Sequence, residues 1–239
     1  MTVMTAPALA GGEAIWTPAR HPLARFLRGV ATGSAPAADG SWMRVSPWSQ
    51  HIQAVLCFGG HAVLAVSYDF TDNQLTEMGV DGWGNAANPR ILTQLAGPSG
   101  WIGSHDVLLL GAGRGSESGG GEPLVSRPDL GQRPAAEHAK RILTDVQVMG
   151  RPDHDDHDLV ILARGVGGLR EVSVDVAPER RGSGHGADLL ARALASVPEN
   201  ELIASPVFAG DAAAVAAYLA AGFVHAGSVQ HFSSRPERR

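Results

Sequence analysis

The most informative stretch of the chain reads Val174-Asp175-Val176-Ala177-Pro178-Glu179-Arg180-Arg181-Gly182-Ser183-Gly184-His185-Gly186. A β-branched segment ends at Pro178, three glycines alternate soon after it, and an amphipathic helical pattern follows. This order predicts a strand, a tight turn and a helix. The helix N-terminus presents unpaired N–H groups, which attract anions together with the helix dipole, and glycine lets a bulky group approach the backbone. The stretch therefore predicts a site for a phosphate or pyrophosphate.

Two common phosphate-binding motifs do not fit this stretch. The glycines are spaced Gly-x-Gly-x-Gly, and no carboxylate follows at the end of a second strand, as a dinucleotide-binding fold requires. The Gly-Lys-Ser/Thr ending of a nucleoside-triphosphate loop is absent as well. A plain strand–turn–helix, in which the glycines serve only the turn, is the alternative.

The stretch resembles the acyl-CoA loop of the GCN5-related N-acetyltransferases (GNAT), whose signature is Arg/Gln-x-x-Gly-x-Gly/Ala. Here the signature reads Arg181-Gly182-Ser183-Gly184-His185-Gly186, after the Val-x-Pro-x-x-Arg lead-in that the family often shows. His185 stands where the family commonly has an aliphatic residue. A second stretch, residues 211–223, is similar to the family motif Asn-x-x-Ala-x-x-x-Tyr-x-x-x-Gly-Phe, with Asp211 in place of Asn. The two motifs cover residues 169–232 of the 239.

The resemblance implies a GNAT-like acyl-CoA N-acyltransferase fold, which is α/β with a mixed sheet, in a C-terminal domain at residues 135–239. Residues 14–114 are predicted to form a smaller α/β unit, and the Gly-, Ser- and Pro-rich residues 115–134 a flexible linker. A complete family domain is longer than the piece after the linker. Either the N-terminal unit supplies the missing opening elements, or it is a degenerate second copy of the same fold.

Hydrophobic patterning predicts the individual elements. The N-terminal unit is expected to contain a helix at 21–30, a strand at 42–45, a hairpin at 52–58 and 62–68, a helix at 89–95 and a strand at 106–110. Because the hairpin is almost continuously apolar, we expect it inside a sheet rather than at its edge. After the linker we expect a helix at 135–143, strands at 145–149, 159–163 and 169–176, a helix behind the glycine loop, a strand at 202–208, a short helix at 211–222 and one bent or two short strands at 224–232.

The resemblance also implies a set of residues that bind acetyl-CoA. The loop amides would hold the CoA pyrophosphate, and Arg181 would add a charge-assisted contact. The main-chain N–H of Val174 or Val176 would bind the thioester carbonyl between two parting strands, at 172–176 and 202–208. The implied residues are Val174, Val176, Arg181, Gly182, Ser183, Gly184, His185, Gly186 and Asp211.

Tyr218 and Glu171 are the candidate catalytic residues. Tyr218 aligns with the tyrosine that usually protonates the departing thiolate, but it also shares a helical face with Val215 and Leu219, so core packing is the alternative. Glu171 is the best carboxylate for a general base. Its register differs by one residue from the family's usual glutamate, and a one-residue shift turns a strand side chain to the opposite face. A chain of water molecules is the alternative base.

Several histidines and aspartates invite a metal assignment. Residues 153–158 read Asp-His-Asp-Asp-His-Asp, but they are consecutive and have neither a helical i, i+4 His pair nor a Cys partner. We expect this run to be a solvated hairpin tip and expect no metal. His225 and His231, near the C-terminal strands, are candidates for the border of an acceptor pocket.

The composition indicates which classes of binding partner and which cellular compartment to expect. A net charge of −5 and a pI near 6.0 argue against a nucleic-acid binder. No apolar run approaches the roughly 18 residues of a membrane span, and no secretory signal is evident. The single cysteine, Cys57, excludes internal disulfides and suits a reducing compartment. We expect a cytoplasmic protein with neither nucleic-acid nor membrane partners.

These observations predict an acetyl-CoA-dependent N-acetyltransferase. Acetyl-CoA would be the cosubstrate, and a primary amine would attack it directly in a ternary complex. The acceptor is a small-molecule or peptide amine that the sequence does not name, and a homodimer is possible. The alternative is a non-catalytic CoA-binding or regulatory module of the same fold.

Overall fold

The computed structural model describes residues 21–116, 122–153 and 157–235. The strands are β1 Trp42–Val45, β2 Gln53–Cys57, β3 Ala62–Ala65, β4 Trp101–Ala112, β5 Val125–Ser126, β6 Thr144–Gly150, β7 Leu159–Arg164, β8 Arg170–Asp175, β9 Leu202–Phe208 and β10 Val224–Ser233. The α-helices are α1 Pro22–Ala31, α2 Asp72–Glu77, α3 Pro89–Ala96, α4 Pro134–Ile142, α5 His185–Ser196 and α6 Ala212–Ala220.

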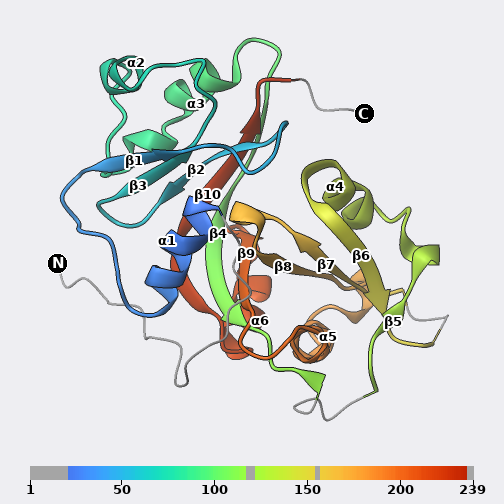
Figure 1. Ribbon diagram of the computed structural model, residues 1–239. Coiled ribbons are helices and arrows are strands. Elements are labelled where there is room, and N and C mark those ends of the chain that lie inside the picture. The colour runs from blue at the N-terminus through green and yellow to red at the C-terminus, as the bar shows by residue number, and fades with distance from the viewer. Residues whose placement is uncertain (1–20, 117–121, 154–156, 236–239) are drawn as a thin grey trace.

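The strands form one ten-stranded sheet in the order β1-β3-β2-β10-β4-β9-β8-β7-β6-β5 (Figure 1). Neighbouring strands are antiparallel except for two parallel pairs, β1 with β3 and β8 with β9. The predicted α/β class with a mixed sheet is confirmed.

The N-terminal hairpin lies inside the sheet, as its continuous apolar arms predict. β2 lies between β3 and β10, and β3 lies between β1 and β2. Sequence patterning missed α2, a short helix that buries only Leu75. The sequence does carry a signal for the start of this helix, because Thr71 and Gln74 form a reciprocal capping box. The C-terminal strand β10 is continuous and carries two irregularities, at residues 225–227 and 230–232.

The two predicted units interleave in the sheet. β4 belongs to the N-terminal unit, yet it lies between β9 and β10 and is antiparallel to both. β10 in turn lies between β4 and β2. The boundaries at 14–114, 115–134 and 135–239 stay predictions about the sequence, while the sheet runs through both units.

The described part of the predicted linker carries regular structure. It contains β5 and a 3-10 turn at Pro128–Leu130, both anchored by Arg127, whose side chain is 1% exposed. The guanidinium donates to the Asp129 carboxylate at 2.8 Å, to the Arg151 carbonyl at 3.0 Å and to the Asp153 carbonyl at 2.8 Å. A buried guanidinium with these acceptors ties the segment to the end of β6.

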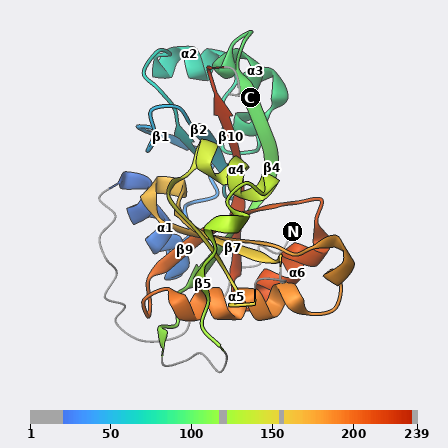
Figure 2. The same ribbon diagram turned by 90° about the vertical axis from the view of Figure 1, so that its right-hand side faces the viewer.

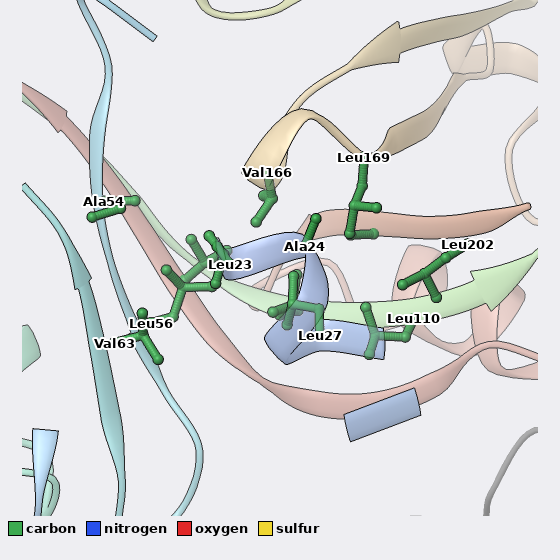
Figure 3. Packing of buried hydrophobic residues seen from close by; sticks show 14 of the residues in the cluster. Leu23, Ala24, Leu27, Ala54, Leu56, Val63, Leu110, Val166, Leu169 and Leu202 are labelled. Atoms are coloured by element: carbon green, nitrogen blue, oxygen red, sulfur yellow. The ribbon is translucent and has the colours of Figure 1, made fainter. Parts of the chain in front are cut away.

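α1 covers the place where the two units meet. Leu23 and Leu27 of α1 are fully buried against residues of β2, β3, β4 and β9 (Figure 3). The opposite face of the C-terminal half is covered by α5 and α6 (Figure 2), whose apolar residues pack against β7, β8 and β9. α4 lies on the α1 side, because Ile161 packs toward α4 while its neighbours Val160 and Leu162 pack toward α5.

The isolated fragment of residues 134–239 should fail to form a cooperative fold. Without β4, strands β9 and β10 lose the neighbour that they share, and without α1 the apolar residues Leu202 and Ala204 face water. We expect an insoluble or molten fragment, measured by near-UV circular dichroism and urea unfolding beside the full chain. A cooperative transition together with acetyl-CoA binding would contradict this expectation.

Candidate functional site

The glycine loop joins the end of β8 to the start of α5. Gly182 and Gly184 have φ values of 78° and 87°, which are left-handed conformations that favour glycine. A Cβ built on either residue would meet no atom within 4 Å. Gly184 is the N-cap of α5 and makes no side-chain cap bond. The loop backbone is therefore open to a ligand at a helix N-terminus, which suits a phosphate.

A buried carboxylate anchors the start of this loop. Asp158 is 0% exposed, and its Oδ1 accepts a hydrogen bond of 2.8 Å from the Ala177 N–H. Arg180 Nε lies 3.4 Å from Asp158 Oδ2, and Arg180 Nη2 lies 2.8 Å from His185 Nδ1. The expectation of a solvated tip at 153–158 is wrong for Asp158, since the backbone and two side chains of the loop surround it. Residues 154–156 lie outside the described residues.

Arg181 folds back onto the strand that precedes the loop. Its side chain is 63% exposed; Nε donates to the Val176 carbonyl at 2.9 Å, and Nη2 lies 3.5 Å from Asp175 Oδ1. Ser183 Oγ donates to the Arg180 carbonyl at 2.5 Å. Arg181 and Ser183 thus lie at the loop, and their contacts with a cofactor stay predictions.

β8 and β9 are parallel neighbours that part after a short contact. Their register pairs only Arg170 with Ile203. At Val172 the fully buried side chain of Ser205 replaces a backbone partner from β9. Its Oγ accepts from the Val172 N–H at 3.2 Å and donates to the Val172 carbonyl at 2.9 Å. Since alternate residues of a strand repeat their orientation, the N–H of Val174 points toward β9 like that of Val172, whereas Val176 lies just beyond the end of β8. Their role toward a thioester stays a prediction.

A cavity of about 220 Å³ lies on the α4 side of these parting strands. Five strands and one helix contribute its walls: β4, β7, β8, β9, β10 and α4. Its polar lining residues are Asp106, His138, Glu171, Ser173, Asp175 and His231, and its apolar ones are Ala135, Ala139, Ile142, Leu143, Ile161, Val174 and Pro206.

Glu171 is the most perturbed acid in this cavity. Its side chain is 7% exposed, and Oε2 has no hydrogen-bond partner among the described residues. Burial, and to a lesser degree the charge of Asp106, raises the pKa of Glu171 from 4.5 to about 8. Gly165 makes room for this carboxylate, because a Cβ there would clash with Oε2.

Burial also shifts the pKa values of two neighbours of Glu171, Asp106 and His231. Burial raises the pKa of Asp106, although the Ser104 hydroxyl, which donates at 2.7 Å, opposes this shift. Burial and the nearby His138 lower the pKa of His231 to about 4, so the His231 ring is neutral at physiological pH. Perturbed acids and bases in one cavity are typical of functional sites.

Sequence reasoning found two members of this cluster and missed two. Glu171 and His231 line the cavity, while His225 is exposed and is not among the lining residues. The role of His231 toward an acceptor stays a prediction. Asp106 and His138 were missed. The available signal for Asp106 was its position on the same strand face as the buried Leu108 and Leu110, where an acid is unusual.

Tyr218 and Asp211 both have structural partners. Tyr218 is 5% exposed, its hydroxyl donates to the Val172 carbonyl at 2.7 Å, and its ring contacts Phe223 edge-on. Burial and the charge of Glu171 raise the pKa of Tyr218. Tyr218 is not among the residues that line the cavity. Asp211 caps α6 by accepting from the Ala214 N–H at 2.9 Å. Their catalytic and cofactor-binding roles stay predictions.

Metal sites and membrane-spanning helices are two further classes of feature. Among the described residues, no group of three or more His, Cys, Asp or Glu side chains is placed to hold a metal ion. Within the same residues, no helix combines the length and the apolar character needed to cross a bilayer.

Several solved structures are similar to part of the chain. A putative GNAT-family acetyltransferase from Novosphingobium aromaticivorans is 21% identical, with 58% of this chain and 68% of that chain covered and a TM-score of 0.40. A functionally unknown conserved protein from Staphylococcus epidermidis is 16% identical (62% and 68% covered, TM-score 0.39). A GCN5-related N-acetyltransferase from Kribbella flavida is 19% identical (62% and 65% covered, TM-score 0.36). No family model and no curated protein matches the sequence. At this level, none of these similarities assigns an activity to the chain.

Glu171→Gln should flatten the pH dependence of stability. Between the ordinary pKa of Glu171, 4.5, and its folded value of about 8, the folded chain keeps a proton that the unfolded chain has lost. The free energy of unfolding therefore falls as the pH rises through this window and levels off above it. Glutamine does not ionise, so the free energy of unfolding of the variant lacks this fall. The stability difference, variant minus parent, should therefore be larger at about pH 8.5 than at about pH 5.

Urea unfolding at the two pH values measures this difference. Glu77→Gln, at an exposed position on α2, is the matched control and should follow the parent. An equal pH dependence in Glu171→Gln and the parent would show that Glu171 ionises normally in the folded chain.

Proposed function

We propose that the protein is an N-acetyltransferase that transfers the acetyl group of acetyl-CoA to a primary amine by direct attack in a ternary complex. The observation that carries the proposal is the arrangement along β8. This strand parts from β9 after Val172, leads into an open glycine loop at the N-terminus of α5, and carries the buried Glu171 into the cavity.

The loop fits a pyrophosphate. Gly182 and Gly184 leave open space where side chains would otherwise project, and the amides of residues 182–186 lie at the start of a helix of 12 residues. Arg181 and His185 would add contacts from either side of the loop, and Asp211 would hold the start of α6. The gap between β8 and β9 would take the pantetheine arm, with the N–H of Val174 or Val176 on the thioester carbonyl.

Glu171 is suited to prepare the amine. An amine reaches the site mainly as its ammonium form. The ionised form of Glu171, whose fraction grows as the pH rises toward 8, would accept a proton from it. The freed nitrogen lone pair then attacks the thioester carbon. As the C–S bond breaks, Tyr218 would supply its hydroxyl proton to the thiolate, and the surplus proton on the attacking nitrogen would restore the Tyr218 hydroxyl. The products are then a neutral amide and the CoA thiol. For this step the Tyr218 hydroxyl must leave the Val172 carbonyl, which keeps its bond from Ser205.

A non-catalytic CoA-binding module is the second candidate function. The observation in its favour is the Tyr218 hydroxyl, which is buried on a backbone carbonyl and lies outside the cavity lining. Acetyl-CoA binding without turnover over a broad panel of amines would support this second candidate.

Acetyl-CoA should stabilise the chain through the glycine loop. A ligand at about 100 times its Kd adds roughly 2.7 kcal/mol, which corresponds to a rise in Tm of about 5 to 10 °C for a chain of this size. Gly184→Val places a branched side chain over the loop and should remove most of this rise. An unchanged Tm of the parent in millimolar acetyl-CoA would refute the cofactor assignment.

Gly79→Val provides a matched control for this experiment. Gly79 has a φ of 89° and no atom within 4 Å of a built Cβ, so its substitution brings the same backbone strain as Gly184→Val. Gly79 lies after α2, far along the chain from the loop. This variant should lose stability but keep the rise in Tm with acetyl-CoA.

Tyr218→Phe tests the acid role. If the hydroxyl protonates the thiolate, kcat should fall by about 10²- to 10⁴-fold while the KM for acetyl-CoA changes little. The lost hydrogen bond should cost about 1 kcal/mol of stability. Tyr68, the other tyrosine, has a side chain that is 71% exposed. Tyr68→Phe is therefore the control and should behave as the parent. Retention of more than about half of the parent kcat, with chemistry rate-limiting, would assign Tyr218 to core packing.

A further inference from the structure

The cavity beside Glu171 has a chemistry that selects its occupant. Resting on the proposed function, we propose that the acceptor is a small primary amine without a carboxylate, bound as a cation between Asp106 and Glu171 with its apolar body against α4.

Two of the three carboxylates in the cavity are available to a cation. Asp175 already pairs with Arg133 at 3.2 Å and lies 3.5 Å from Arg181. Glu171 has a buried oxygen without a hydrogen-bond partner. Asp106 accepts a bond from the uncharged Ser104 hydroxyl. A bound ammonium group would give both acids a charged donor and relieve their mutual repulsion.

The lining contains nothing that would hold an anion permanently. Among the described residues that form its walls, none is a lysine or an arginine. His231 is neutral near physiological pH because it is buried, and His138 is the remaining basic side chain. A ligand carboxylate would therefore lie beside Asp106 and Glu171, while the nearby Arg133 and Arg181 are already placed against Asp175. Such an arrangement is unfavourable in a largely buried site. This excludes amino acids as good occupants.

The volume of the cavity and its apolar wall limit the size and polarity of the acceptor beyond its amino group. A volume of about 220 Å³ lies below the roughly 300–1,000 Å³ of drug-sized pockets. The α4 side of the cavity presents Ala135, Ala139, Ile142 and Leu143. A short aliphatic or aromatic amine matches this combination of two acids and an apolar wall.

The acid pair also predicts a proton balance. The cavity itself is lined by Asp106 on β4, Glu171 and Asp175 on β8, His138 on α4 and His231 on β10. His105, the neighbour of Asp106 on β4, also acts on Asp106 by its charge. Near neutral pH the Asp106–Glu171 pair retains a proton, because burial and like charge oppose full ionisation. An ammonium ion that binds there displaces this proton, so binding should release protons and should tighten as the pH rises toward 8.

Calorimetric binding to the full chain tests the inference with two matched pairs of ligands. These are 3-methylbutylamine against leucine and 2-phenylethylamine against phenylalanine, in which each amino acid adds only a carboxylate. We expect at least one amine to bind at least about tenfold more tightly than its amino acid, with proton release seen in buffers of different ionisation enthalpy. Equal or tighter binding of the amino acids, or no binding of either amine at millimolar concentration, would overturn the inference.

The substitution Asp106→Asn tests whether the amine binds beside Asp106. It should weaken amine binding about tenfold or more and reduce the preference over the amino acid, whereas Glu77→Gln should change neither. If Asp106→Asn does not fold, the ligand pairs on the unaltered chain still decide the matter. Unchanged amine affinity in a folded Asp106→Asn would overturn the assigned position.

The same samples separate this inference from the proposed function. The rise in Tm with acetyl-CoA is measured independently of the amines. Selective amine binding without acetyl-CoA binding would contradict acetyl transfer and leave the cavity assignment intact. Turnover of acetyl-CoA with amino acids as the preferred acceptors would contradict the cavity assignment and leave acetyl transfer intact.

Discussion

Ser205 joins β8 to β9 at Val172 through two hydrogen bonds, and the rest of the candidate site depends on this junction. A side-chain hydroxyl here satisfies both backbone groups of Val172, so the parallel ladder can end without leaving buried polar groups unpaired. Beyond the junction the strands are free to part. The cavity at Glu171 adjoins this point, the glycine loop follows farther along the chain from β8, and the Tyr218 hydroxyl donates to the same Val172 carbonyl.

The interleaving of β4 and β10 gives the N-terminal half a part in the site. β4 brings Asp106 to the cavity, and α1 covers the core where both halves meet. Burying Asp106 and Glu171 together lowers stability, since each acid is costly to ionise away from water. Natural chains keep such arrangements mainly where chemistry needs them. The interleaved sheet and its large shared core supply the rigidity that holds the two acids together.

Local patterns in the sequence predicted most elements, and non-local contacts account for what they missed. The bounds of β1 and β9 and the interior position of the hairpin follow from runs of apolar residues. The insertion of β4 between β9 and β10 has no local signal, because strand pairing depends on partners about 100 residues away. For the same reason Asp106 and His138 were not associated with Glu171. Asp158 was misjudged by composition: an acidic run predicts solvation, but its last residue binds the Ala177 amide and lies beside Arg180.

The central claim is that the gap between β8 and β9 receives acetyl-CoA. Backbone amide hydrogen exchange of the full chain, with and without acetyl-CoA, tests it most directly. The account predicts that exchange at Val174 or Val176, and at the loop amides of residues 182–186, slows when acetyl-CoA is added. The amides of β1 and β3, at the far edge of the sheet, should not respond. Binding of acetyl-CoA with unchanged exchange at Val174, Val176 and the loop would place the ligand elsewhere and contradict the account.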